Sequence, residues 1–103
     1  MAQDITAQEL KIKLDNREDF ILIDVREIFE HTEFNIGGEL APLQTSFPYK
    51  IETLKGSEDK EIVVYCRSGN RSGVAKAMLQ NAGFSNVRNL IGGMIHWRTE
   101  FNS

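Results

Sequence analysis

The sequence predicts an α/β fold built on a parallel sheet, and the apolar pattern carries that prediction. The runs Phe20–Val25 and Ile62–Tyr65 are almost wholly apolar, which is typical of strands buried on both faces, as in parallel sheets. Segments with helical spacing separate and follow these runs; the clearest, Ser72–Ala82, has apolar residues at intervals of four. Alternating helices and strands indicate a parallel α/β sheet.

Capping and turn residues place the other elements. Thr6 and Glu9 have the spacing of a capping box at the start of a helix. Pro48 suits the first turn of a helix that begins at Phe47, and Gly83 is the expected terminator of the helix after 72. The expected elements, in chain order, are a strand at Ile5, a helix from Thr6 to Asp15, a strand at Phe20–Val25, a short helix through Glu27–Glu33, a strand at Glu39–Ala41, a helix from Phe47, a strand at Ile62–Tyr65, a helix at Ser72–Ala82, a strand at Val87–Ile91 and a helix at Met94–Phe101.

The length and composition of the chain predict a single domain that spans residues 1–103. No apolar stretch approaches the length of a membrane span, and the polar start Met1–Asp4 does not resemble a signal peptide, so we expect no membrane partner. The single cysteine excludes an internal disulfide and a dithiol redox cycle within the chain. A lone thiol fits a reducing compartment, and we expect a cytoplasmic protein.

The net charge of −3 is unevenly distributed along the chain. Residues 1–61 carry 14 acidic and 7 basic side chains, whereas residues 62–103 carry five lysines and arginines and one acid, Glu100. This asymmetry favours a small anionic substrate near the second half. Five cations without interleaved aromatic residues, in an acidic chain, make a poor nucleic-acid surface, so we expect no nucleic-acid partner.

The only cysteine, Cys66, stands where a predicted strand ends and a short loop leads into a helix. In open α/β sheets ligands bind beyond the carboxyl ends of the strands, and a helix N-terminus offers unpaired amides and about half a positive charge. Gly69 can adopt positive φ, which allows the loop amides to form an anion nest. Arg67 and Arg71 add two permanent charges. Such surroundings lower the pKa of a thiol from about 8.5, so Cys66 is the predicted nucleophile.

The alternative is that Cys66 is simply a small buried side chain, as free cysteines commonly are. No apolar environment calls for the polar residues that follow it, and we therefore favour the reactive role. Ser72 is expected to cap the helix, although its hydroxyl could also reach the sulfur. The predicted substrate-binding residues are Arg67, Ser68, Gly69, Asn70, Arg71 and Ser72.

Asp24 and Arg26 end the preceding strand, on the same rim of the sheet as Cys66. Asp24 could act as a general base, but we favour a supporting role in which the two side chains bind one another or cap backbone groups around the active loop (Cys66–Ser72). Arg26 could add positive potential. Glu27, Glu30 and Glu33 are interpreted as the solvated side of a short helix.

Nothing in the sequence indicates a metal or an organic cofactor. His31 and His96 are the only histidines, and with Cys66 they show no spacing typical of zinc sites. The sequence also lacks a Gly-rich dinucleotide-binding motif. We therefore expect no metal and no cofactor.

Three motifs resemble the single-domain rhodaneses: Asp24–Glu27, Val64–Ser72 and Gly92–Trp97. The likeness extends over nearly the whole chain, and the cysteine loop is its specific part. It implies a three-layer rhodanese-like domain with a central five-stranded parallel sheet and helices on both faces. One departure is Phe34–Glu39, where many members have Gly-His-Ile-Pro-Gly-Ala. Its Asn-Ile-Gly-Gly form resembles rhodanese domains fused to adenylating enzymes that thiolate sulfur-carrier proteins, which makes a protein partner conceivable.

The resemblance also implies sulfurtransferase chemistry. The Cys66 thiolate would take a sulfur from a small anionic donor such as thiosulfate and pass it from a persulfide to a thiol, cyanide or an acceptor protein. One alternative is a non-catalytic binding module, although such modules usually lack the cysteine. Another is a cysteine phosphatase or arsenate reductase, which places an arginine six positions after the cysteine. Here position 72 is serine and Arg71 comes one residue early.

Overall fold

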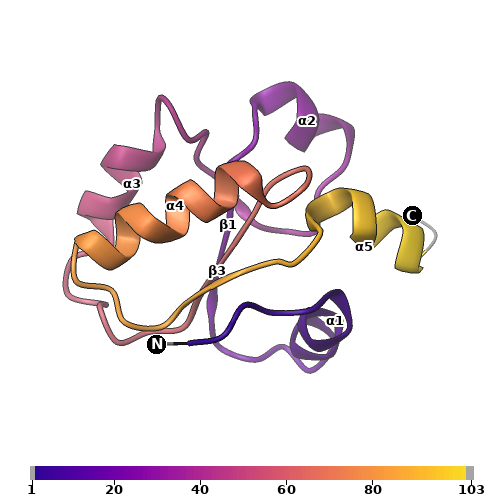
Figure 1. Cartoon of the computed structure of the whole chain (residues 1–103), viewed down its shortest axis with the longest axis horizontal. Helices are drawn as coiled ribbons and strands as arrows, with labels where there is room; N and C mark the ends of the chain where they lie inside the picture. The colour runs from indigo at the N-terminus through magenta and orange to yellow at the C-terminus, as the bar shows by residue number, and fades with distance from the viewer. Residues whose placement is uncertain (1, 102–103) are drawn as a thin grey trace.

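The computed structural model describes residues 2–101 as a parallel sheet with helices around it; Met1, part of the expected polar N-terminus, lies outside the described residues (Figure 1). The strands are β1 (Ile21–Asp24), β2 (Glu39–Leu40), β3 (Ile62–Tyr65) and β4 (Val87–Asn89). The helices are α1 (Ala7–Asp15), α2 (Ile28–Glu33), α3 (Phe47–Thr53), α4 (Asn70–Asn81) and α5 (Gly93–Phe101). The strands pair in the order β2-β1-β3-β4, all in parallel.

Helices cover both faces of the sheet, which confirms the predicted three-layer α/β fold (Figure 1). Because successive side chains of a strand point to opposite faces, β3 contributes to two cores. Ile62 and Val64 pack with buried side chains of α3 and α4, and Val63 and Tyr65 pack with those of α1 and α5. All four β3 side chains are fully buried, as their apolar run predicts.

The prediction of five strands is wrong for the described residues, since the sheet has four. Ile5 forms only an isolated parallel bridge with Leu90 beside β4. The chain cannot continue as a strand there because Thr6 is already the N-cap of α1, in the capping box with Glu9 that the sequence predicts. β4 is also shorter than predicted and ends at Asn89.

The phenol group of Tyr65 is buried without a hydrogen bond. Its ring is fully buried beside β1, and among the described residues no group pairs with the hydroxyl. Burial raises the pKa of Tyr65, and the nearby amides of Ile36 and Gly38 oppose that increase only in part. The hydroxyl therefore loses its hydrogen bonds to water on folding and gains only weak contacts with these two amides in return.

A Tyr65→Phe substitution is therefore expected to leave the free energy of unfolding unchanged or to raise it by about 1 kcal/mol. Urea unfolding of both proteins measures this change. Tyr49→Phe is a matched control, because Tyr49 is 75% exposed and its loss of a hydroxyl should have no effect. A loss of stability in Tyr65→Phe alone would mean that the hydroxyl has a partner in solution.

None of the helices within residues 2–101 combines the length and the apolar character that crossing a bilayer requires.

Candidate active site

Cys66 lies at the carboxyl end of β3, in a tight loop before α4. Gly69 is the N-cap of α4 and has φ 107°, so the positive φ predicted for it is confirmed. This conformation turns backbone amides toward the sulfur. The Cys66 Sγ atom accepts hydrogen bonds from the Gly69 amide at 3.0 Å and the Ser72 amide at 3.4 Å, and it lies 3.3 Å from the Ser72 hydroxyl.

These contacts favour the ionised thiol. Cys66 is only 1% exposed, and burial by itself raises the pKa of a thiol. Hydrogen bonds from the Ser72 hydroxyl and from the amides of Ser72, Gly69 and Ser68 more than offset burial and lower the pKa of Cys66. Cys66 thus belongs to the buried cluster beneath α3 and α4, but its sulfur faces hydrogen-bond donors of Gly69 and Ser72, which favour the thiolate.

Ser72 does not cap the helix, so that expectation is wrong. Gly69 takes the N-cap position, which makes Ser72 the third helical residue and turns its fully buried side chain toward the end of the sheet. There the hydroxyl contacts the Cys66 sulfur and, at 2.6 Å, the Asn89 Oδ1 atom. Asn89 ends β4 and also donates from Nδ2 to the Gly69 carbonyl at 3.0 Å.

Arg71 is bound within the protein. Its guanidinium donates to both carboxylate oxygens of Glu30, at 2.8 and 3.0 Å, and this pairing lowers the pKa of Glu30 to about 2. The Glu30 side chain is only 14% exposed, so its interpretation as part of a solvated face is wrong. Glu30 on α2 and Arg71 on α4 are 41 positions apart in the sequence. The helical pattern of neither segment therefore indicates that the two side chains meet.

Asp24 and Arg26 bind one another, as predicted. Asp24 is fully buried and accepts from the Arg26 guanidinium at 2.9 and 2.7 Å. His31 Nδ1 lies 2.8 Å from the same carboxylate, and Arg26 also donates to the Phe34 carbonyl at 2.7 Å. Burial opposes ionisation of Asp24, but these contacts outweigh it and lower the pKa. Asp24 therefore holds α2 and its flanking turns in place.

The start of α5 supports the active loop from the other side. The Met94 amide donates to the Cys66 carbonyl at 3.0 Å, and the Ile95 amide donates to the Arg67 carbonyl at 3.0 Å. Gly93 makes this contact possible: it has φ 57°, and a Cβ atom there would lie 2.5 Å from the Arg67 carbonyl oxygen. The first free amides of α5 thus satisfy two carbonyls of the loop.

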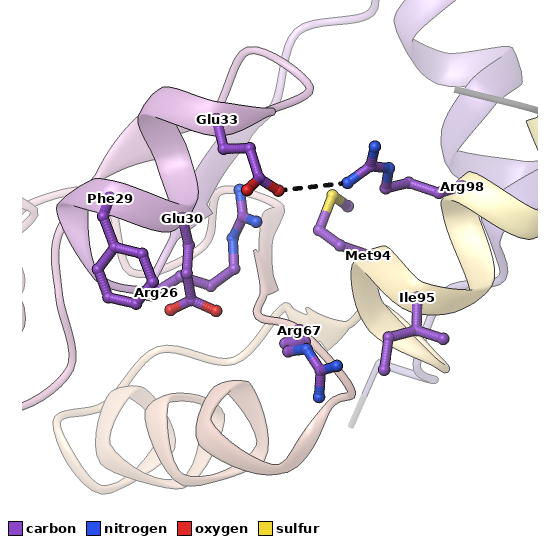
Figure 2. Close-up of a pocket in the computed structure, with 8 residues that line it drawn as sticks. All are labelled: Arg26, Phe29, Glu30, Glu33, Arg67, Met94, Ile95 and Arg98. Carbon is purple, nitrogen blue, oxygen red and sulfur yellow. Dashed lines mark ion pairs between the residues drawn. The ribbon is translucent and has the colours of Figure 1, made fainter.

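A pocket of about 490 Å³ opens beside the loop, between α2 and α5 (Figure 2). Arg67 is the loop residue that lines it, and none of the ion pairs among residues 2–101 involves its guanidinium. Ser68 and Asn70 are exposed on the loop, and Asn70 begins α4. The pocket-lining residues are Arg26, Phe29, Glu30, Glu33, Arg67, Met94, Ile95 and Arg98.

The family of the chain follows from a comparison of its sequence with known families. The model of the rhodanese-like domain matches residues 6–100. The chain belongs to the rhodanese-like domain family. A sulfurtransferase of Allochromatium vinosum is 35% identical to it over 100 residues, covering 94% of this chain and 89% of the relative. These two comparisons confirm the resemblance on which the predicted function depends.

Other relatives place the same domain in different settings. The adenylyltransferase and sulfurtransferase MOCS3-2 of Zea mays is 34% identical over 98 residues, which cover 90% of this chain but 20% of the relative. The structure of a rhodanese-like domain protein from Staphylococcus aureus superposes with a TM-score of 0.81 at 28% identity, covering 94% of this chain and 91% of that one. The rhodanese-like fold is thus shared by short proteins and by longer ones.

The rhodanese-like domain brings most of the predicted site together, and it adds residues that sequence reasoning missed. Asn89, Glu30 and Gly93 contact the side chains or carbonyls of the active loop. The sequence holds a signal for two of these three residues: Asn89 is a polar residue at the end of a strand, on the same rim as Cys66, and Gly93 belongs to a Gly-Gly pair before a helix. No group of three or more candidate metal ligands occurs within residues 2–101.

Proposed function

We propose that this rhodanese-like domain is a sulfurtransferase that carries one sulfane sulfur as a persulfide on Cys66. The observation that carries the proposal is the set of donors around the Cys66 sulfur, which lowers the pKa of its thiol. The family and its sulfurtransferase relative support a transferase. Thiosulfate, or a donor of similar charge and size, is the proposed first substrate.

The reaction divides into two displacements. The Cys66 thiolate attacks the outer sulfur of thiosulfate, the S–S bond of the donor breaks, and sulfite leaves with the bonding electron pair. An acceptor thiolate then attacks the terminal sulfur of the persulfide, and Cys66 leaves as a thiolate. Covalent catalysis of this kind replaces one difficult transfer with two easier ones. The amides of Gly69 and Ser72 stabilise the negative sulfur at both stages.

The pocket between α2 and α5 supports the choice of substrates. Arg67 is available there for a sulfonate or carboxylate, whereas Arg71 already binds Glu30. Phe29 is 71% exposed and Ile95 48% exposed, and they line the pocket from opposite helices (Figure 2). Thiosulfate has no apolar part to contact them. These side chains therefore favour an organic thiol or a protein as the sulfur acceptor.

Mass spectrometry tests the proposal directly. Incubation with thiosulfate followed by desalting is expected to add one sulfur atom to the native protein and none to Cys66→Ala or Cys66→Ser. Subsequent addition of an organic thiol should remove that sulfur. No sulfur on the native protein would favour a binding module, and an equal gain in Cys66→Ala would place the chemistry elsewhere. Turnover of a phosphate ester without sulfur uptake would favour the phosphatase.

A further inference from the structure

The Ser72 hydroxyl lies between two acceptors but has one proton to donate. Its oxygen is 3.3 Å from the Cys66 sulfur and 2.6 Å from the Asn89 Oδ1 atom. Because a hydroxyl carries a single donor and two acceptor lone pairs, it cannot donate fully to both. Ser72 is fully buried, so solvent does not supply an alternative partner.

The orientation of the Asn89 amide follows from its second contact. The Gly69 carbonyl oxygen lies 3.0 Å from Asn89 Nδ2 and can only accept a hydrogen bond, so the NH₂ group must face it. The Oδ1 atom is thereby directed toward Ser72. The backbone amide of Asn89 is also held, by the Asp4 carboxylate at 3.0 Å. Asn89 is thus a fixed acceptor for the Ser72 proton.

We propose that Asn89 is a positioning residue that competes with Cys66 for the Ser72 hydroxyl proton and so sets the reactivity of the thiol. In the neutral state the thiol donates to the Ser72 oxygen while the hydroxyl donates to Asn89. On ionisation the thiol proton leaves to solvent, and the hydroxyl must turn from Asn89 to the sulfur to stabilise the thiolate. The Asn89 contact therefore opposes ionisation.

This competition matters for a sulfur carrier, and in that respect the inference rests on the proposed function. A thiolate with a very low pKa is abundant but weakly nucleophilic, and the best attacking thiol has a pKa near the ambient pH. Two loop amides already favour the thiolate of Cys66. By retaining the Ser72 proton, Asn89 limits how far those donors depress the pKa and so preserves nucleophilicity.

The substitutions in the experiment that follows leave the other charged groups around Cys66 in place. They are Arg67 in the loop, Arg71 on α4 with Glu30 paired to it from α2, and Asp4 beside the backbone of β4. Because Cys66 is the only cysteine, its ionisation can be followed by the ultraviolet absorbance of the thiolate, with Cys66→Ala protein as the blank. This readout needs neither a sulfur donor nor access of a reagent to the buried thiol.

Four proteins form the central experiment: the native chain, Asn89→Ala, Ser72→Ala and the double variant. Asn89→Ala is expected to shift the titration midpoint to lower pH, equivalent to a roughly 2- to 10-fold larger ionisation constant, which is the effect of one hydrogen bond. The same substitution in the Ser72→Ala background is expected to cause no shift, because the shared proton is gone. If Asn89 only shaped the loop, its substitution would shift the titration midpoint by the same amount with and without Ser72.

Asn89→Asp provides an independent variant of nearly the same size. Its carboxylate accepts the Ser72 proton more strongly and adds a negative charge, so its midpoint should move to higher pH. The inference is overturned if Asn89→Ala causes no shift, an upward shift or the same shift with and without Ser72, or if Asn89→Asp moves the midpoint downward. Sulfur uptake from thiosulfate, measured on the same proteins, reports separately on the proposed function.

Discussion

Gly93→Ala is expected to disrupt the active loop while the rest of the fold persists. A methyl group at this position would lie 2.5 Å from the Arg67 carbonyl oxygen and 2.6 Å from the Cys66 carbonyl oxygen, which is too close for any real contact. The start of α5 must therefore move away from the loop that it supports. The positive φ of 57° adds a conformational cost, of about 1–3 kcal/mol for a strained residue.

The effect on sulfur uptake should be larger than the effect on stability. The Met94 and Ile95 amides hold the carbonyls of Cys66 and Arg67, and a shift of α5 removes both hydrogen bonds. A displacement of about 1 Å in a catalytic group can reduce a rate on the order of 100-fold. We therefore expect sulfur uptake by Gly93→Ala to slow to that extent, measured as the rate of persulfide formation by mass spectrometry.

Gly83→Ala is the matched control for this substitution. Gly83 also has a positive φ, of 98°, but nothing lies within 4 Å of the position that its Cβ would occupy. It terminates α4, at the opposite end from Cys66. Its substitution should reduce the free energy of unfolding by about 1–2 kcal/mol and leave the uptake rate unchanged. Equal uptake rates for both variants would show that α5 does not position the loop.

Local signals were sufficient to predict most of the fold. The Thr6–Glu9 capping box and the left-handed Gly69 depend on residues a few positions apart, and each occurs where the pattern places it. The apolar run Ile62–Tyr65 predicts a strand that is buried on both faces because four consecutive apolar residues leave such a strand no polar face, and all four side chains are buried. Ile5 differs because the capping signal next to it ends the strand after one residue.

The parts of the site that sequence could not predict depend on contacts between distant segments. Glu30 meets Arg71 41 residues along the chain, and Asn89 meets Ser72 at a separation of 17. A pattern of charged residues on a short helix shows which side is polar, but it does not show that a neighbouring element supplies a cation. The prediction that Cys66 is the nucleophile depends instead on local features, because strand, loop and helix N-terminus are contiguous around it.

The Glu30–Arg71 pair also predicts how the protein responds to acid. The pKa of Glu30 lies at about 2 in the folded state, lowered from 4.5 mainly by the Arg71 hydrogen bonds. A carboxylate with a lowered pKa stabilises the fold above its unfolded value and loses that contribution as the pH falls to its folded value. The contribution of Glu30 is therefore complete above about pH 4.5 and disappears toward about pH 2.

Replacing Glu30 by glutamine isolates this contribution. At neutral pH, Glu30→Gln is expected to lower the free energy of unfolding by about 1–2 kcal/mol, less than the full shift in pKa implies because Arg71 is 35% exposed and water screens the pair. Urea unfolding at a series of pH values should show the native protein and the variant converging as the pH falls from about 4.5 to about 2.

Glu33→Gln tests whether the effect belongs to this pair or to any acid on α2. Glu33 is 77% exposed and lies 3.5 Å from Arg98, a geometry in which an ion pair contributes little to stability (Figure 2). The Glu33 variant should therefore have the same free energy of unfolding as the native protein at every pH. If the Glu30 variant instead remained less stable by a constant amount down to about pH 2, the loss would reflect packing of the side chain, and the carboxylate would have no electrostatic role in holding Arg71 beside the active loop.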